Sequence, residues 1–262
     1  MGRNLYFDRN VFHHIRARSG ITDDDARTLK NAVAAGRIAI LLSVTLIEET
    51  LPVLKASPET AEAEKQLVID LTDPKKVIKP HAELLRDDVV AYAKGEARPS
   101  PFTTEFPGFL QFLTPRRADL PGLLGVVRDT QKQKLETQAN FRRAKDSDSQ
   151  YFKTRHKGPR PSFREYLDRH SLEMAKKLAG RFAVSHECRN RGFDGLLQIR
   201  SVKLYIGSGL SHAYAQIFEG RAPKPGDSRD LHHAVLASAA DSFVTQDTEF
   251  ARILNRLQVE DF

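Results

Sequence analysis

The sequence has one cysteine, Cys188, and no tryptophan among its 262 residues. A single cysteine excludes an internal disulfide framework and fits a reducing, intracellular environment. No apolar run approaches the roughly 20 residues that cross a bilayer. The N-terminal segment MGRNLYFDRN also lacks the apolar core of a signal peptide. We therefore expect a cytoplasmic protein without a membrane segment.

Several catalytic and cofactor signatures are missing as well. The sequence contains no Gly-x-Ser-x-Gly elbow, which disfavours serine hydrolase chemistry. His186 and Cys188 lack the second ligand pair that a structural zinc site needs. The stretch YIGSGLSHAY has a Gly-x-Gly but not the third glycine of a dinucleotide-binding turn, so we interpret it as a tight turn.

Positive charge is concentrated in the middle of the chain. The net charge is +7, yet residues 94–181 contain 19 Lys or Arg against 10 Asp or Glu, and the remaining residues contain 22 against 24. A basic block attracts polyanions, because each neutralised phosphate releases condensed counterions. A solvated helical surface can also be basic without any ligand, so charge alone does not identify a partner.

Strands and helices alternate at both ends of the sequence. The first part predicts a strand at LYF, a helix through VFHHIRAR, a helix ending at Gly36, a strand at RIAILLS, and helices over TLIEETLPVLKA, 59–73 and 80–95. The last part predicts a helix in GSGLSHAYAQIFEG after a glycine turn, a helix in DSRDLHHAVLASAA, a strand at SFVT, a helix in TEFARILNRL and an edge strand at QVEDF. This alternation is typical of α/β proteins, and we expect a three-layer α/β/α sandwich around a mostly parallel sheet.

The middle block interrupts the alternation. Its five prolines in RPSPFTTEFPGFLQFLTPRRADLPG exclude one long helix. Further along, LLGVVRDTQKQKLETQANFRRAKD predicts an amphipathic helix, SQYFKTRHKGPRPSF an exposed basic loop, and REYLDRHSLEMAKKLAGRF a helix. We therefore predict an α/β domain made of residues 1–93 and 182–262, with a basic, mostly helical insertion over 94–181.

Acidic residues stand where the predicted strands end or where helices begin. Asp8 ends the first strand, Glu48 and Glu49 lie about one turn into the helix after the second, Asp230 opens a helix, and Asp247 ends the strand SFVT. The carboxyl ends of parallel strands share one edge, so these carboxylates are expected to converge. Clustered carboxylates repel unless a cation lies among them, and their hard oxygens suit Mg²⁺ or Mn²⁺. Each acid alone is also explained by a helix cap, the helix dipole or solvent exposure.

Three stretches resemble PIN-domain nucleases: YFDRNV, LLSVTLIEETLPVL and DSRDLHHAVLASAADSFVTQDTEF. The resemblance covers about residues 4–60 and 200–262. It implies metal-binding and catalytic carboxylates at Asp8, Asp230 and Asp247 and at one Glu, with supporting polar groups at Asn10 and Thr245. The number of residues between Ser43 and the glutamate, and the pattern Glu-x-x-x-x-Leu that ends at Leu54, favour Glu49. The pattern Thr-Leu-x-Glu favours Glu48, so both stay candidates.

The resemblance implies a divalent-metal-dependent endoribonuclease that hydrolyses RNA in preference to DNA, as a toxin of a toxin–antitoxin pair or as an RNA-processing or defence nuclease. It implies Mg²⁺ or Mn²⁺ as cofactor, and an antitoxin or inhibitor protein or a second subunit as further partners. Basic residues would follow the RNA backbone away from the cleavage point, with Tyr151 and Phe152 stacking on bases or packing beneath the insertion. The candidates for nucleic-acid binding are Arg142, Arg143, Lys145, Lys153, Arg155, Lys157 and Arg160.

Two alternatives remain open. A protein on the same fold can bind RNA without cutting it, although all the expected acid positions are filled here. The motif GDSRD also resembles the last motif of haloacid-dehalogenase-type phosphatases, with YFDRNV as their opening motif. Phosphatases of this type use a second Asp as general acid at the position that Asn10 occupies here. Their mechanism also gives no role to VTQD.

Overall fold

The computed structural model describes residues 2–46, 49, 53, 56–103, 129, 132, 135–136, 139–140, 142–143, 146–147, 150, 159–224 and 226–259. The chain divides into two compact units, each described by itself below. The first unit comprises residues 1–80, 100–130 and 236–248, and the second comprises 81–99, 131–235 and 249–262. Within the described parts, no helix has the length and apolar character needed to cross a membrane.

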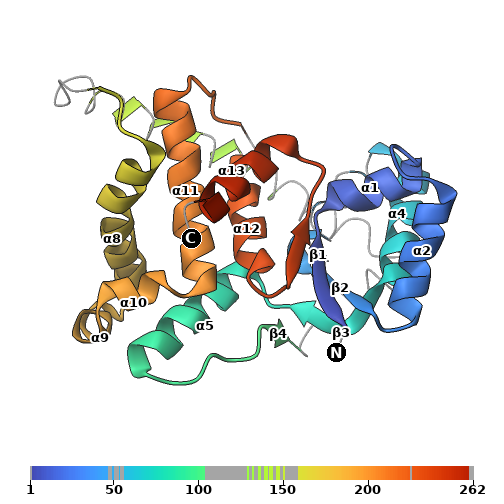
Figure 1. Cartoon of the computed structure of the whole chain (residues 1–262), viewed down its shortest axis with the longest axis horizontal. Coiled ribbons are helices and arrows are strands. Elements are labelled where there is room, and N and C mark those ends of the chain that lie inside the picture. Colours follow the sequence, from blue (N-terminus) through green and yellow to red (C-terminus); the bar gives the residue numbers. More distant parts are fainter. Residues whose placement is uncertain are drawn as a thin grey trace. The chain divides into compact units, whose positions relative to one another are not determined.

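The first unit contains a five-stranded sheet in the order β4-β3-β2-β1-β5 (Figure 1). Its strands are β1 (Arg3–Phe7), β2 (Ile38–Ser43), β3 (Thr72–Ile78), β4 (Phe102–Thr103) and β5 (Ser242–Val244). β1 pairs in parallel with β2 and β5, and β2 pairs in parallel with β3. Only the two-residue β4 is antiparallel to its neighbour. The mixed α/β class and the mostly parallel sheet are therefore confirmed.

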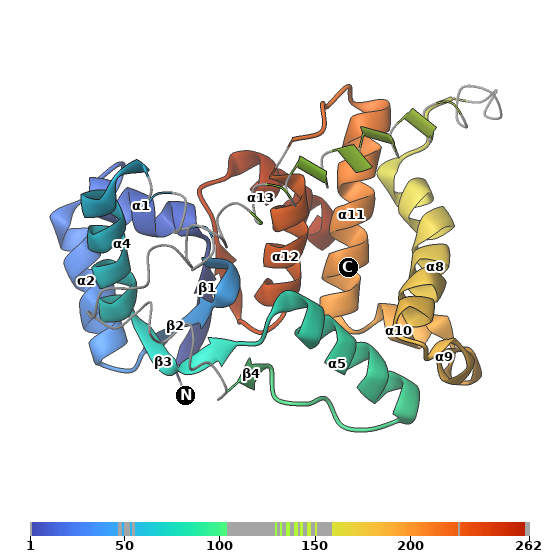
Figure 2. The same ribbon diagram turned by 180° about the vertical axis from the view of Figure 1, so that it is seen from behind.

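Three helices of the first unit gather beside this sheet (Figure 2): α1 (Arg9–Ala17), α2 (Asp23–Ala34) and α4 (Pro58–Leu71). α1 contacts β1 and α4, α2 contacts β2 and α4, and α4 contacts β3. α1 buries Val11, Phe12 and Ile15, which lie on one face of the helix. These side chains pack with residues of β2 such as Ile40 and Leu42 into one apolar core. The predicted strands LYF and RIAILLS and the two helices predicted between them are confirmed. More than half of the helix predicted over TLIEETLPVLKA lies outside the described residues, and its described residues, 45, 46, 49, 53 and 56, are helical.

β3 is a strand that the sequence pattern did not predict. The helix predicted over 59–73 ends at Leu71, and residues 72–78 are extended. The segment TDPKKVI contains a proline and two lysines, both disfavoured in central strands, so local propensity gives little indication of a strand. Its only apolar side chains, Val77 and Ile78, are buried opposite Leu42 and Ser43 of β2. Pairing with β2 therefore decides this conformation.

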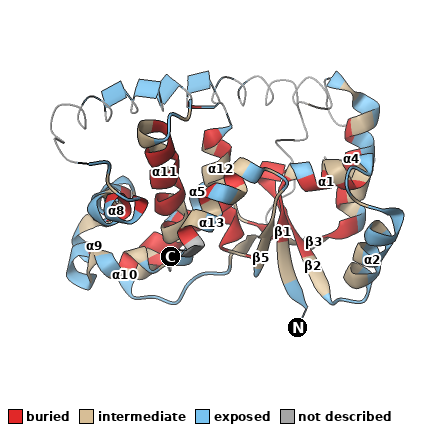
Figure 3. Ribbon diagram, turned by 45° about the horizontal axis from the view of Figure 1, so that its top comes forward, coloured by how far each residue is buried: buried red, intermediate tan, exposed pale blue. Residues whose placement is uncertain are grey.

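The second unit is helical. Its helices with described bounds are α5 (His81–Lys94), α8 (Phe163–Arg181), α9 (Ser185–Arg191), α10 (Phe193–Leu197), α11 (Arg200–Phe218), α12 (Asp227–Ala237) and α13 (Thr248–Val259). The last two residues of α12 and the first of α13 belong to the first unit. α11 is largely buried (Figure 3) and packs against α5, α8 and α10. The helices predicted at 80–95, in REYLDRHSLEMAKKLAGRF, in DSRDLHHAVLASAA and in TEFARILNRL are confirmed.

Two predictions about the end of the chain are wrong. Gly207 and Gly209 do not form a turn but lie inside α11, which begins at Arg200. Burial of the surrounding helix compensates for the low helix propensity of these glycines. Gln258 and Val259 continue α13 and do not form the expected edge strand. The other residues of that strand lie outside the described part of the chain.

The middle block is described only in part. All described residues between 129 and 150 are helical and exposed. Those up to 146 agree with the helix predicted there, but Leu135, which is 63% exposed, does not fit a buried apolar face, and Gln150 is helical although it was predicted to lie in the basic loop. The proline-rich stretch from 104 and the loop residues 151–158 lie outside the described residues. The predicted division into 1–93 plus 182–262 and an insertion over 94–181 stays a prediction.

A buried ion-pair cluster ties α1 to α4 within the first unit. The side chain of Glu64, on α4, is 1% exposed. Its carboxylate accepts hydrogen bonds from Arg9 Nη2 at 2.8 Å and His13 Nδ1 at 2.9 Å, and Arg16 Nε lies 3.4 Å away. Burial, the largest single influence, raises the pKa of Glu64, but the hydrogen bonds and charges of His13 and Arg9 together hold it below its usual 4.5. The cluster fixes the start of α1, directly after Asp8.

We expect Glu64→Gln to lower the free energy of unfolding at neutral pH by about 1–3 kcal/mol, because it leaves Arg9 and Arg16 without the acid that they share with His13. A depressed folded-state pKa gives a stabilisation that is present above the unfolded pKa and is lost as pH falls through the folded value. The difference between variant and wild type should therefore shrink at about pH 3. Urea unfolding at both pH values measures it.

The matched control is Glu62→Gln, on the same helix, whose side chain is 60% exposed and pairs with Lys65. That exposed pair should contribute less than about 1 kcal/mol. An equal loss for Glu64→Gln at both pH values would show that the ion pairs are not the cause.

Candidate active site

Asp8 and Asp247 follow the carboxyl ends of neighbouring parallel strands. Phe7 of β1 lies opposite Val244 of β5, and the Asp8 N–H donates to the Val244 carbonyl oxygen at 3.2 Å. The Thr245 hydroxyl, 237 residues away in sequence, donates to Asp8 Oδ2. The Thr245 hydroxyl oxygen in turn accepts a hydrogen bond from the Asp247 N–H at 3.0 Å. One hydroxyl thus connects the Asp8 carboxylate to the backbone of Asp247 at the same edge of the sheet.

This edge is also the place where the order of the strands reverses. From β1 the chain passes through β2 to β3 on one side of the sheet, and β5 pairs with β1 on the other side. Open α/β sheets bind ligands in the crevice outside the carboxyl ends of their strands at such a switch point. Asp8 and Asp247 therefore lie where the topology favours a ligand.

Burial and helix capping hold Asp8 in place. The residue is only 5% exposed, and Asp8 Oδ1 accepts the Val11 N–H at 3.1 Å, which makes Asp8 the N-cap of α1. The simpler explanation of this acid is therefore correct, but it does not exclude a second role. A carboxylate offers about four lone-pair sites, and a helix cap uses one of them.

The predicted glutamate lies in the segment after β2. Residues 44–46 are helical, and the Leu46 N–H donates to Ser43 Oγ at 3.1 Å at the carboxyl end of that strand. Glu49 is helical and half-buried. Glu48 lies outside the described residues, so the choice between the two glutamates stays open. Of the supporting polar residues, Thr245 is half-buried between the two acids, and Asn10 is exposed in the first turn of α1.

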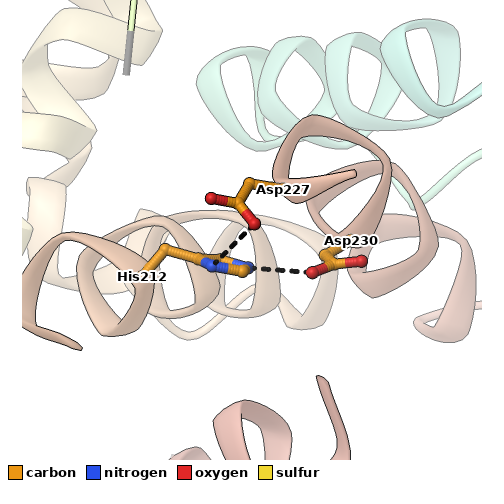
Figure 4. Close-up of side chains that lie close together, drawn as sticks. All are labelled: His212, Asp227 and Asp230. Carbon is orange, nitrogen blue, oxygen red and sulfur yellow. Dashed lines mark ion pairs between the residues drawn. The ribbon is translucent and has the colours of Figure 1, made fainter. Parts of the chain in front are cut away.

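Asp230 belongs to the second unit, where it lies beside His212 (Figure 4). His212 Nε2 is 3.4 Å from Asp230 Oδ2, and His212 Nδ1 is 4.0 Å from Asp227 Oδ1. One ligand atom from each of the three residues lies within 4.8 Å of the others, a spacing that a metal ion could bridge. His212 was not predicted as a site residue, because its position inside an apolar helix gives no signal of acids in the next helix.

Asp227 already has a strong cationic partner. Arg221 donates from Nη1 and Nη2 to its two oxygens at 2.8 and 2.6 Å, and Gln216 Nε2 and the Lys224 N–H donate at 3.1 and 3.0 Å. Arg221 also bonds to Glu249. Burial lowers the pKa of Arg221, but the hydrogen bonds to these acids outweigh it and raise the pKa. The negative charge of Asp227 is thus balanced without a metal, which favours an ion-pair network at this place.

The same network bears on the phosphatase alternative. Asp227 is the first acid of the motif GDSRD, and both of its oxygens are held by Arg221. The described residues before the motif, 219–224, do not form a strand. The phosphatase interpretation needs an available acid after a strand at this place, so these observations disfavour it.

The predicted RNA-binding residues fall into three groups. Arg142 and Arg143 are helical and exposed. Arg160 donates from Nε to the Tyr214 hydroxyl at 3.0 Å and from Nη2 to Glu219 at 3.1 Å, so it has internal partners. The others lie outside the described residues: Lys145, Lys153, Arg155 and Lys157, together with Tyr151 and Phe152.

Comparison with known proteins gives no relative. No family model matches the sequence, and no match was found among curated proteins or solved structures. The resemblance to PIN-domain nucleases therefore stays a hypothesis that rests on the residues of this chain.

Proposed function

We propose that this protein is a divalent-metal-dependent endoribonuclease with a PIN-like, three-layer α/β/α architecture. The observation that carries the proposal is the position of Asp8 and Asp247 after neighbouring parallel strands, at the switch point of the sheet, where the Thr245 hydroxyl bonds to the Asp8 carboxylate and to the Asp247 N–H. Residues far apart in sequence supply this pair. Asp8 caps α1 and Asp247 directly precedes α13, so capping can explain each acid by itself, but it gives no reason for both acids to follow neighbouring strands.

The chemistry of the donors fits Mg²⁺ or Mn²⁺, which prefer carboxylate oxygens. Asp8, Asp247 and Glu49 or Glu48 would hold the ion, with Asp230 as the further ligand that the resemblance implies. When bound, such an ion supplies the Lewis acidity that phosphodiester hydrolysis needs. The Val11 N–H and the Thr245 hydroxyl orient the Asp8 carboxylate, and Thr245 also fixes the backbone of Asp247.

RNA is the proposed substrate because the excess of basic over acidic residues lies within residues 94–181 and because many bacterial members of the resembled family cut RNA. Arg142 and Arg143 present exposed guanidinium groups that can pair with phosphates. An antitoxin, an inhibitor protein or a second subunit are further partners that the same resemblance proposes.

The purified protein should cleave RNA when Mg²⁺ or Mn²⁺ is present and should lose this activity in EDTA. Sequencing the ends of the fragments identifies the cleaved bonds and the target. RNA binding without cleavage under any of these metal conditions would favour the non-catalytic RNA-binding alternative. A DNA substrate of matched sequence serves as the control for substrate class.

A further inference from the structure

The second unit contains a pocket of about 600 Å³ that the proposed metal site does not use. Its volume lies within the range of small-molecule and cofactor sites. Helices α5, α8, α11 and α12 contribute most of its lining, which includes His81, Arg181, Phe182, Tyr205, Ser228 and His232. Among the described residues that line it, none is acidic. The pocket therefore combines flat rings with positive charge.

Two histidines form a flat surface in the wall of the pocket. The rings of His81 and His232 are stacked, with centroids 3.5 Å apart and an interplanar angle of 13°. Burial, followed by the charges of Arg181 and Arg229, lowers the pKa of His81 to about 4. The two stacked rings offer a flat aromatic face, and the guanidinium of Arg181 on the same lining adds positive charge.

The pocket also adjoins a predicted RNA-binding residue. Asn140 lines it, and Arg143 Nη2 donates to Asn140 Oδ1 at 2.8 Å. On the lining itself, Arg181 is exposed, with its guanidinium carbon 5.9 Å from the centre of the Phe182 ring. A ligand with a planar ring and an adjacent phosphate would match both features.

We propose that this pocket binds one unpaired nucleotide of an RNA strand, with the base stacked on the aromatic lining and the phosphate paired with Arg181. The proposal rests on the proposed function for the identity of the ligand, since it takes the polyanion to be RNA. Base stacking on aromatic rings tolerates any sequence and needs an unpaired base. The pocket would therefore select single-stranded positions of the substrate and not a particular base.

The test measures binding of a fluorescently labelled single-stranded RNA in EDTA, so that cleavage does not interfere. Tyr205→Leu should weaken binding about 5- to 100-fold by loss of stacking, with an unchanged salt slope. Tyr205→Phe keeps the ring and should bind like wild type. Arg181→Gln should weaken binding and reduce the slope of log K against log salt by about 0.7, the value for one phosphate contact to a single strand.

The matched control is Arg169→Gln, which removes the same charge from an exposed position on the same helix, α8. It should leave affinity near the wild-type value. Normal RNA binding by Tyr205→Leu and Arg181→Gln would overturn the pocket proposal and leave the nuclease proposal standing. No RNA binding by wild type would overturn the proposed function itself.

Adenosine 5′-monophosphate, titrated separately and followed by NMR, distinguishes a strand nucleotide from a free one. The proposal is supported if the mononucleotide binds more weakly than the RNA and if Arg181→Gln weakens the binding of both ligands. Binding of the mononucleotide as tight as that of RNA would overturn it in favour of a free nucleotide ligand.

Discussion

Asp8→Asn is expected to abolish RNA cleavage without lowering the stability of the fold. Asparagine caps helices about as well as aspartate, so its side-chain oxygen can still accept the Val11 N–H. A neutral amide, however, removes the charge and the oxygen donor that a divalent ion requires. We expect activity to fall by at least about 100-fold. Cleavage assays with Mg²⁺ or Mn²⁺, together with denaturant unfolding, measure both effects.

Two comparisons make this result specific. Asp8→Ala should lose activity and also about 1 kcal/mol of stability, because alanine cannot cap α1. Asp247→Asn should lose activity like Asp8→Asn, whereas Asp241→Asn should remain active. Asp241 precedes β5 at its other end and accepts the Asn4 N–H at 2.7 Å, a bond that asparagine can keep. Full activity of Asp8→Asn would contradict the assignment of the metal site.

Arg221→Met is expected to lower the free energy of unfolding by about 3–5 kcal/mol, because it leaves a buried carboxylate without its cation. The side chains of Arg221 and Asp227 are 8% and 1% exposed, and two hydrogen bonds join them. Arg221 also holds Glu249 of α13, so its loss releases a second acid. Urea unfolding followed by circular dichroism gives the difference.

Arg252→Met is the matched control. Its side chain is 53% exposed and lies 3.4 Å from Glu219, so the same substitution should cost less than about 1 kcal/mol. Equal losses in the two variants would show that the Asp227 network does not differ from an ordinary surface ion pair.

The local sequence predicts most of the individual elements well. The strands at LYF and RIAILLS are short apolar runs, and α1 has an apolar face preceded by an Asp that can cap it. Such features depend on side-chain period and capping chemistry within a few residues, so they can be read without knowledge of the fold. The local sequence does not predict β3, and it wrongly predicts a turn at the glycines within α11. Tertiary packing overrides local propensity at both places.

The candidate site shows the same division. The sequence by itself determined that Asp8 and Asp247 follow apolar strands, and strand alternation made it reasonable to expect them at one edge. Only the tertiary structure decided that β1 and β5 are neighbours, that Thr245 bonds to both acids, and that Asp227 is held by Arg221. Hydrogen bonds and ion pairs between residues far apart in sequence depend on which elements pair. No local pattern of residues carries that information, because it arises only when the whole chain buries its apolar surface.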